Sequence, residues 1–190
     1  WPRHGPVEGS AIAETTATFN WSGNDNINAP LTYAYRLDSQ PWSAFDAVTS
    51  VVLNALAEGE HVFQVKARDA AGNEDSTPAA RNFSVDTTAP EPPTNLAARA
   101  TETGIGLSWA HSPSDDVASY RLFWNAGEGD IDYGQPYRTI VHPASAFSIS
   151  AVPDPGTYRF GLRAVDRAGN MELNTDVTAL VVVEALQMAV

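Results

Sequence analysis

A pattern of alternating apolar residues that ends in Asp-x-x-Gly-Asn occurs twice in this chain, in residues 59–73 and again in residues 156–170. The two runs align without a gap, at an offset of 97 positions (156 − 59). Upstream of them, Phe19-Asn-Trp21 matches Leu107-Ser-Trp109. A repeat of this length predicts two copies of one structural unit.

A proline-rich connector separates the two copies. Pro90, Pro92 and Pro93 fall within four residues, and proline favours an extended, stiff backbone. We therefore expect two domains, residues 1–89 and residues 90–190. The formal net charge of −12 is shared evenly between them, so neither half is a charged tail.

The periodicity within each copy is two residues, as in a β-strand. Tyr158, Phe160, Leu162 and Ala164 alternate with small or polar residues, and no helical pattern of ten or more residues occurs. The second copy carries an additional polar stretch at 125–136. The pattern predicts an all-β chain of two tandem antiparallel β-sandwiches, with about seven strands each.

Four segments of the second copy carry a family resemblance: Leu107-Ser-Trp109, residues 114–122, Pro155-Gly156-Thr-Tyr158 and Val165-Asp166-Arg-Ala-Gly169-Asn170. On these segments the second copy resembles a fibronectin type III domain. The resemblance implies a tyrosine corner at Tyr158. The first copy is similar to bacterial immunoglobulin-like and fibronectin-like modules, although His61 stands where the second copy has Tyr158. An imidazole at that position can still reach a backbone group.

Composition excludes several classes of function. A net charge of −12 disfavours binding to nucleic acid and to anionic lipid. The longest apolar run, residues 179–183, is too short to enter a membrane as a spanning helix. The chain has no cysteine, begins at Trp1 and shows no signal peptide, so we expect it to be part of a longer protein.

Catalytic signatures are absent from the sequence. The four histidines are not at the spacing of a metal-binding helix, and neither Gly-x-Ser-x-Gly nor His-Glu-x-x-His occurs. We therefore expect a chain that is not an enzyme and that needs no cofactor, with calcium as the one candidate ion.

The calcium hypothesis rests on two loops that this topology places at one pole of the second domain. They carry five side chains with oxygen atoms, the ligands that calcium prefers: Asp115, Asp116, Asp166, Asn170 and Glu172. A cation there could stiffen the joint between the domains. The alternative is structural, because Asp, Asn and Gly are also the residues that hairpin turns favour.

A second candidate site is a set of aromatic side chains on which a sugar could stack. Trp21 and Trp109 alternate in phase with core residues, so we expect them to be buried. Four other aromatics are candidates for ligand binding: Trp42, Trp124, Tyr133 and Tyr137. Arg159 and Arg163 are expected on an outer sheet face, paired with acidic neighbours.

The resemblance implies a module of a multidomain protein, secreted or on the cell surface of a bacterium. The expected role is a non-catalytic spacer, display or adhesion module whose partners are the neighbouring domains of its parent protein. The alternative is a module, attached to a secreted enzyme, that binds polysaccharide or a surface protein. An exposed aromatic patch would favour binding, and a scattered polar surface would favour the spacer.

Overall fold

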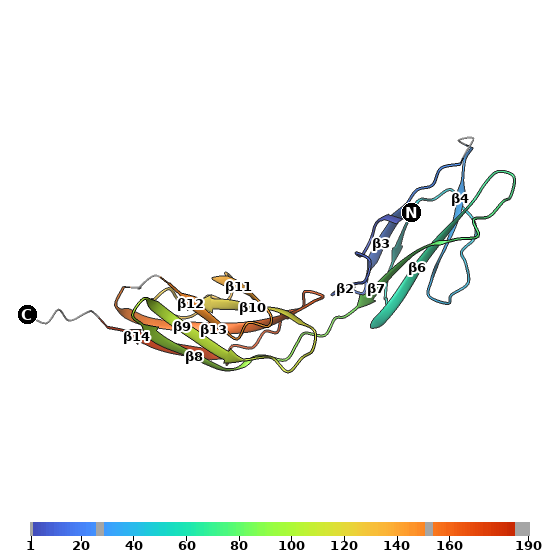
Figure 1. Cartoon of the computed structure of the whole chain (residues 1–190). Coiled ribbons are helices and arrows are strands. Elements are labelled where there is room, and N and C mark those ends of the chain that lie inside the picture. The colour runs from blue at the N-terminus through green and yellow to red at the C-terminus, as the bar shows by residue number, and fades with distance from the viewer. Residues whose placement is uncertain (1, 26–28, 151–153, 185–190) are drawn as a thin grey trace, which may run out of the picture. The chain divides into compact units, whose positions relative to one another are not determined.

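The computed structural model describes residues 2–25, 29–150 and 154–184, which form only strands, turns and loops. The chain separates into two compact units, Trp1–Thr88 and Ala89–Val190. Within the described residues, no helix has the length and apolar character needed to cross a bilayer. Figure 1 shows the strands of each unit.

Unit 1 is a sandwich of a three-stranded and a four-stranded sheet, in the orders β1-β3-β5 and β2-β7-β6-β4. Its strands are β1 (Pro2–His4), β2 (Ser10–Ile12), β3 (Ala17–Trp21), β4 (Thr32–Leu37), β5 (Ser50–Leu53), β6 (Gly59–Arg68) and β7 (Ala79–Val85).

The first residues of unit 1 belong to the sandwich. Pro2 pairs with Trp21 in one sheet, and β2 then joins the other sheet as the parallel neighbour of β7. Such short strands are held by backbone pairing, which leaves little trace in side-chain periodicity.

Unit 2 is also a three-stranded sheet, β12-β9-β8, packed on a four-stranded sheet, β11-β10-β13-β14. All of its strand pairs are antiparallel. Its strands are β8 (Thr94–Thr101), β9 (Gly104–Ala110), β10 (Val117–Trp124), β11 (Arg138–Val141), β12 (Ala146–Ile149), β13 (Gly156–Asp166) and β14 (Thr178–Val183).

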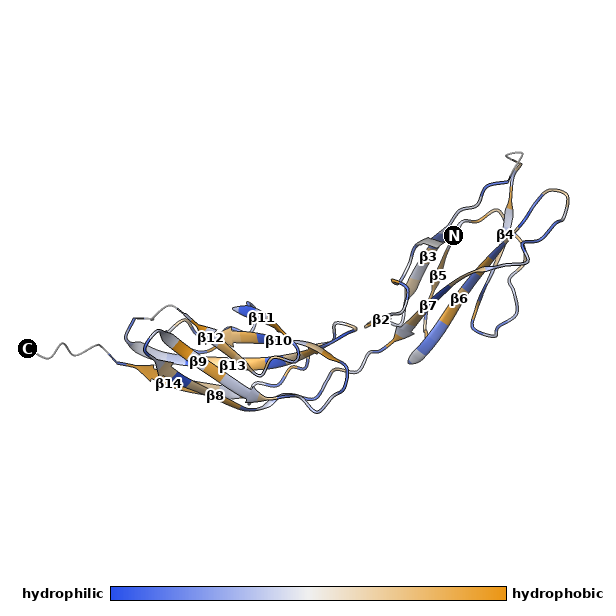
Figure 2. Cartoon of the chain, viewed as in Figure 1, coloured by the Kyte–Doolittle hydropathy of each residue, from blue (hydrophilic) through white to orange (hydrophobic). Residues whose placement is uncertain are grey.

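Each unit buries its own aromatic core between its two sheets. In unit 1, Phe19 stacks on Phe63 with ring centroids 4.0 Å apart. In unit 2, Trp109 meets Tyr120 edge to face at 5.7 Å. The expected burial of Trp109 and its counterpart Trp21 is confirmed. Figure 2 shows the alternation of hydrophilic and hydrophobic residues along β6.

The chain enters and leaves each unit at opposite ends. In unit 2, Thr94 at the start of β8 pairs with Ala110, whereas Val183 at the end of β14 pairs with Gly156, the first residue of β13. Asp166, the last residue of β13, pairs with the start of β10. Since β13 runs from one end to the other, the two ends of unit 2 lie about 35 Å apart at ~3.3 Å per residue.

Unit 1 has the same arrangement. Pro2 pairs with Trp21 at the end of β3, and Val85 pairs with Gly59, the first residue of β6. The far end of β6 pairs with the start of β4, near the end of β3. The chain therefore crosses the full length of β6 between entering and leaving.

Candidate functional site

The corner at the start of β6 in unit 1 and of β13 in unit 2 is built by a different side chain in each unit. The Tyr158 hydroxyl donates to the carbonyl oxygen of Asp154, four residues back, at 2.8 Å. In unit 1, Nε2 of His61 lies 2.9 Å from the carbonyl oxygen of Ala57, also four residues back. The expectation that an imidazole can replace the tyrosine at this corner is confirmed.

His61 also binds a carboxylate, which the tyrosine does not. Its Nδ1 lies 2.9 Å from Oδ2 of Asp38, while Oδ1 of Asp38 accepts the backbone N–H of Val62. Burial by itself lowers the pKa of His61, but the Ala57 carbonyl, Asp38 and Glu60 together raise that pKa above its ordinary value. The corner of unit 1 is therefore sensitive to protonation.

The repeated Asp-x-x-Gly-Asn motif forms the same turn in both units. Asp69 donates its backbone N–H to the carbonyl oxygen of Asn73, and Asp166 does so to Asn170. The carboxylate of each aspartate accepts both the backbone and the side-chain N–H of its asparagine. The glycine before each asparagine has a positive φ, 91° at one turn and 102° at the other, where other residues are strained. The motif is thus explained by turn geometry.

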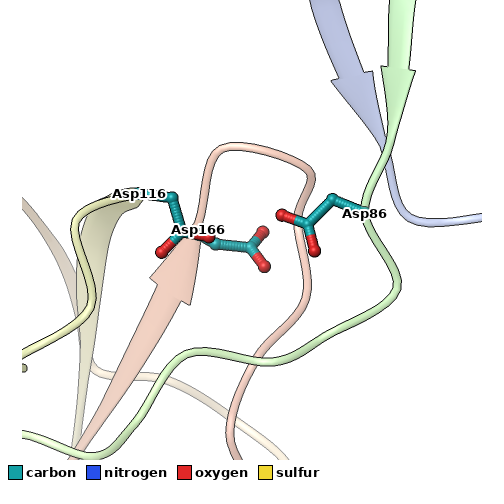
Figure 3. Close-up of side chains that lie close together, drawn as sticks. All are labelled: Asp86, Asp116 and Asp166. Atoms are coloured by element: carbon teal, nitrogen blue, oxygen red, sulfur yellow. The ribbon is translucent and has the colours of Figure 1, made fainter. Parts of the chain in front are cut away.

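Of the five residues predicted to bind calcium, the structure brings two carboxylates together, and a third residue, Asn170, is hydrogen bonded to one of them. Carboxylate oxygens of Asp116, in the β9–β10 loop, and Asp166, at the end of β13, lie within 4.8 Å of each other (Figure 3). Asp166 is 2% exposed, and Asp116 is half-buried. The third side chain drawn there, Asp86, belongs to unit 1, where its carboxylate accepts the backbone N–H of Thr88.

The other predicted calcium ligands have different surroundings. Asp115 is exposed, and the side-chain amide of Asn170 donates to Asp166. Both oxygens of Glu172 are hydrogen bonded, Oε1 to the backbone of Ala164 and Oε2 to Asn174. Glu172 is 6% exposed and joins its own loop to β13, so its carboxylate is not directed at Asp166.

The predicted aromatic candidates of unit 2 lie on opposite faces of one sheet. Trp124 and Tyr137 pack with ring centroids 4.5 Å apart and cover the edge of the core beside Phe160. Tyr133 lies on the outer face, 5.1 Å from the ring of Phe123. The three rings therefore do not form one platform.

Tyr133 is part of a small packed layer on the outer face of β10 and β13. The loop after β10 folds over this face, and the guanidinium of Arg163 lies 4.1 Å from the Tyr133 ring centroid. Gly161 makes room for the ring, because a Cβ there would lie 2.5 Å from the tyrosine hydroxyl. The residues beside this layer line a cavity of about 410 Å³: Asp130, Ile131, Arg159, Thr175, Thr178, Ala179 and Leu180.

Arg163 points to the outer face as expected, but the expectation that it pairs with an acidic side chain is wrong. It is 7% exposed, and its guanidinium donates to the carbonyl oxygens of Asn174 and Leu173. The alternation of residues located its face correctly. It could not show that Tyr133 and its loop would cover that face.

Unit 1 has a comparable layer around Trp42. The loop after β4 places Trp42 and Phe45 on the outer face of β4 and β6. Arg36 and Lys66 lie 4.6 and 4.9 Å from the Trp42 ring, and Arg68 lies 4.0 Å from the Phe45 ring. Trp42 is half-buried, and its ring is already in contact with cations.

A cavity of unit 1 lies beside its turn. Its volume is about 640 Å³, and Trp21 and Tyr33 line it together with Asp25, Asp69 and Asp75. The Tyr33 hydroxyl accepts the backbone N–H of Gly23, and the carboxylates of Asp69 and Asp75 cap their own turns. The lining of this cavity comes from four separate segments, which only the folded chain brings together.

Comparison with known proteins supports the fold and its setting. No family model matches the chain. Over 185 residues the chain is 27% identical to chitinase A1 of Niallia circulans, a match that covers 93% of this chain and 25% of that protein. The chain thus spans about a quarter of the length of this relative.

Solved structures of tandem modules share the architecture. Fibronectin(III)-like modules of Clostridium thermocellum CbhA match with a TM-score of 0.64 at 12% identity, covering 97% of this chain and 93% of theirs. Domains FN1–FN3 of chicken CNTN1 match at 0.60 and 13%, covering 97% and 67%. Titin domains A168–A170 match at 0.53 and 14%, covering 94% and 62%. Both units are fibronectin type III-like or immunoglobulin-like β-sandwiches, as predicted.

Proposed function

We propose that this chain is a non-catalytic pair of modules within a larger secreted bacterial enzyme, and that it acts as a spacer between neighbouring domains. The observation that carries the proposal is the strand order of each unit, in which the chain enters at one end and leaves at the other. Each unit thereby adds about 35 Å of reach at ~3.3 Å per residue of its long strand.

The separate cores of the two units also support a spacer. Each unit packs its own buried aromatic cluster, so each can fold and carry load independently. The formal net charge of −12 favours solubility of the pair of modules.

The match to chitinase A1 supports the setting. This match covers nearly the whole of the present chain but only a quarter of that enzyme, so the shared region is a part that recurs in a larger protein. We infer that the parent of this chain acts on an insoluble polysaccharide outside the cell, where a catalytic domain benefits from reach.

The contacts of the aromatic candidates favour the spacer over direct sugar binding. Trp124 and Tyr137 pack against the core, Tyr133 lies against Arg163, and Trp42 lies against Arg36. Sugar stacking needs an open ring face, and each of these rings already has a protein neighbour.

The spacer proposal is tested by replacing the matching region of chitinase A1 with this chain, or with a Gly/Ser linker of equal residue number. We expect the chimera with this chain to retain hydrolysis of insoluble chitin, and the flexible linker to lose part of it. Hydrolysis of a short soluble substrate is the control and should be equal in both. Equal hydrolysis of insoluble chitin by the two chimeras would argue against a spacer.

Binding of the isolated 190-residue chain to insoluble chitin and cellulose separates the alternative function. A spacer remains in the supernatant. Retention on either polymer that Trp42→Ala or Tyr133→Ala abolishes would favour a binding module instead.

A second proposal is calcium binding at Asp116 and Asp166, favoured by the short distance between their carboxylate oxygens. Thermal unfolding in EDTA and in millimolar calcium tests it, because a free calcium concentration 1,000 times the Kd adds about 4 kcal/mol of stability. An unfolding temperature that calcium does not raise, or that it raises equally in Asp116→Ala, would exclude this site.

A further inference from the structure

Two histidines that are 31 positions apart in the sequence meet at one end of unit 2. Nδ1 of His111, which follows β9, lies 3.4 Å from Nδ1 of His142, which follows β11. The two imidazole rings are nearly perpendicular, at 83°, with centroids 5.0 Å apart. Their nitrogen atoms therefore face each other.

The protein holds both rings in place before any ligand arrives. Each imidazole lies against the ring of Tyr120, a fully buried core residue, with centroid distances of 6.3 and 6.0 Å. The Tyr120 hydroxyl accepts the backbone N–H of Ser112, next to His111, and the backbone N–H of His142 donates to Ala118. Pre-organised side chains lose little conformational entropy when they bind.

A further backbone hydrogen bond joins the segments that carry His111 and His142. Trp109 donates its N–H to the carbonyl oxygen of Ser145, so the end of β9 and the turn after β11 are tied together. His111 is exposed and His142 is half-buried, and an ion from solvent can reach both rings.

The spacing of the nitrogens suits a metal ion better than a hydrogen bond. At 3.4 Å the separation exceeds the ~2.7–3.2 Å of a good N–H hydrogen bond. Two nitrogens that bind one tetrahedral ion at about 2.0–2.1 Å are ~3.3–3.4 Å apart, and their ring centroids are ~5.2 Å apart. The observed 3.4 and 5.0 Å agree with both values.

We propose that His111 and His142 bind a divalent transition-metal ion, such as Zn²⁺, through their Nδ1 atoms. Neutral imidazole is a ligand for zinc, copper and nickel, whereas calcium and magnesium prefer oxygen. Two protein ligands leave the remaining positions of the ion to water or to a group of a partner molecule. The bound ion would connect the β9–β10 loop to the turn after β11.

The other two histidines have different surroundings and serve as internal references. Both ring nitrogens of His61 are engaged, one by the Ala57 carbonyl and one by Asp38. His4 is an exposed histidine in the other unit.

Calorimetric titration of the full chain with Zn²⁺ tests the proposal, in millimolar calcium to occupy surface carboxylates. We expect one equivalent to bind. His111→Gln and His142→Gln should each weaken binding about tenfold or more, whereas His4→Gln should leave it unchanged. A titration with Mg²⁺ should show no binding at this site. The proposal is overturned if the wild type shows no zinc binding, or if the His111 and His142 variants bind zinc as the wild type does.

A second measurement on the wild type does not depend on how the variants fold. Substoichiometric Cu²⁺ broadens the NMR signals of the rings that bind it, and copper is the tightest-binding of these ions. We expect the ring signals of His111 and His142 to broaden before those of His4 and His61. Equal broadening of all four would overturn the proposal.

Discussion

The Tyr133 ring packs over Gly161. We therefore predict that the substitution Gly161→Ala lowers stability when this ring is present and raises it when the ring is absent. A methyl group at position 161 would lie 2.5 Å from the tyrosine hydroxyl and 2.9 Å from two ring carbons. In Gly161→Ala, Tyr133 must therefore move outward, away from Arg163 and Phe123, which it contacts at 4.1 and 5.1 Å.

The magnitude follows from those contacts. Inserting a methyl group into a packed site costs about 1–3 kcal/mol. The loss of the cation–π and aromatic contacts of Tyr133 gives a similar figure, ~1–3 kcal/mol. When Tyr133→Ala has already removed the ring, the three atoms nearest to the methyl group are gone. Alanine is then favoured over glycine within a strand by roughly 0.5–1 kcal/mol. We expect Gly161→Ala to destabilise the wild type and to stabilise the Tyr133→Ala variant slightly.

Amide hydrogen exchange of the full chain, read on peptides from β10 and β13, measures the opening free energy of unit 2 in all four proteins of this cycle. In thermal unfolding, each kcal/mol of destabilisation by Gly161→Ala lowers the unfolding temperature of a unit of this size by ~4–8 °C. Peptides from unit 1 are the control and should exchange equally in all four. Equal destabilisation by Gly161→Ala in both backgrounds would refute the role given to Tyr133.

Two further predictions concern the corner and the turn. The raised pKa of His61 means that its stabilising contribution is fully present below the unfolded pKa of ~6.5 and is lost as the pH rises through the folded pKa. Unit 1 should therefore unfold at a lower temperature at pH 8 than at pH 6, and His61→Tyr, which copies Tyr158 of unit 2, should remove most of that difference. An unchanged pH dependence in His61→Tyr would contradict this assignment. At the turns, Asp166→Ala should cost about 1–3 kcal/mol, because water cannot replace a buried acceptor. Asp69→Ala, at the less buried counterpart, should cost less. Urea unfolding measures both losses, and a larger loss of stability in Asp69→Ala would be evidence against burial as the reason.

The repeat and its two-residue periodicity determined the fold class. The sequences of strands β6 and β13 alternate between apolar residues and polar or small ones, so their inner faces could be read directly from Phe63 and Phe160. The turn motif was equally legible, because glycine at positive φ and a capping aspartate are local requirements of the backbone. The alignment of the two copies also placed His61 opposite Tyr158. In the structure both side chains reach a carbonyl oxygen four residues back.

Contacts between distant segments were decided by the tertiary structure alone. Periodicity assigned Arg163 to an outer face but could not show that the loop carrying Tyr133 would bury it. The same holds for His111 and His142, which no spacing rule connects. A strand pattern fixes which face a side chain occupies. Which loop covers that face, and which loop ends meet, depends on packing between segments that are far apart in the chain.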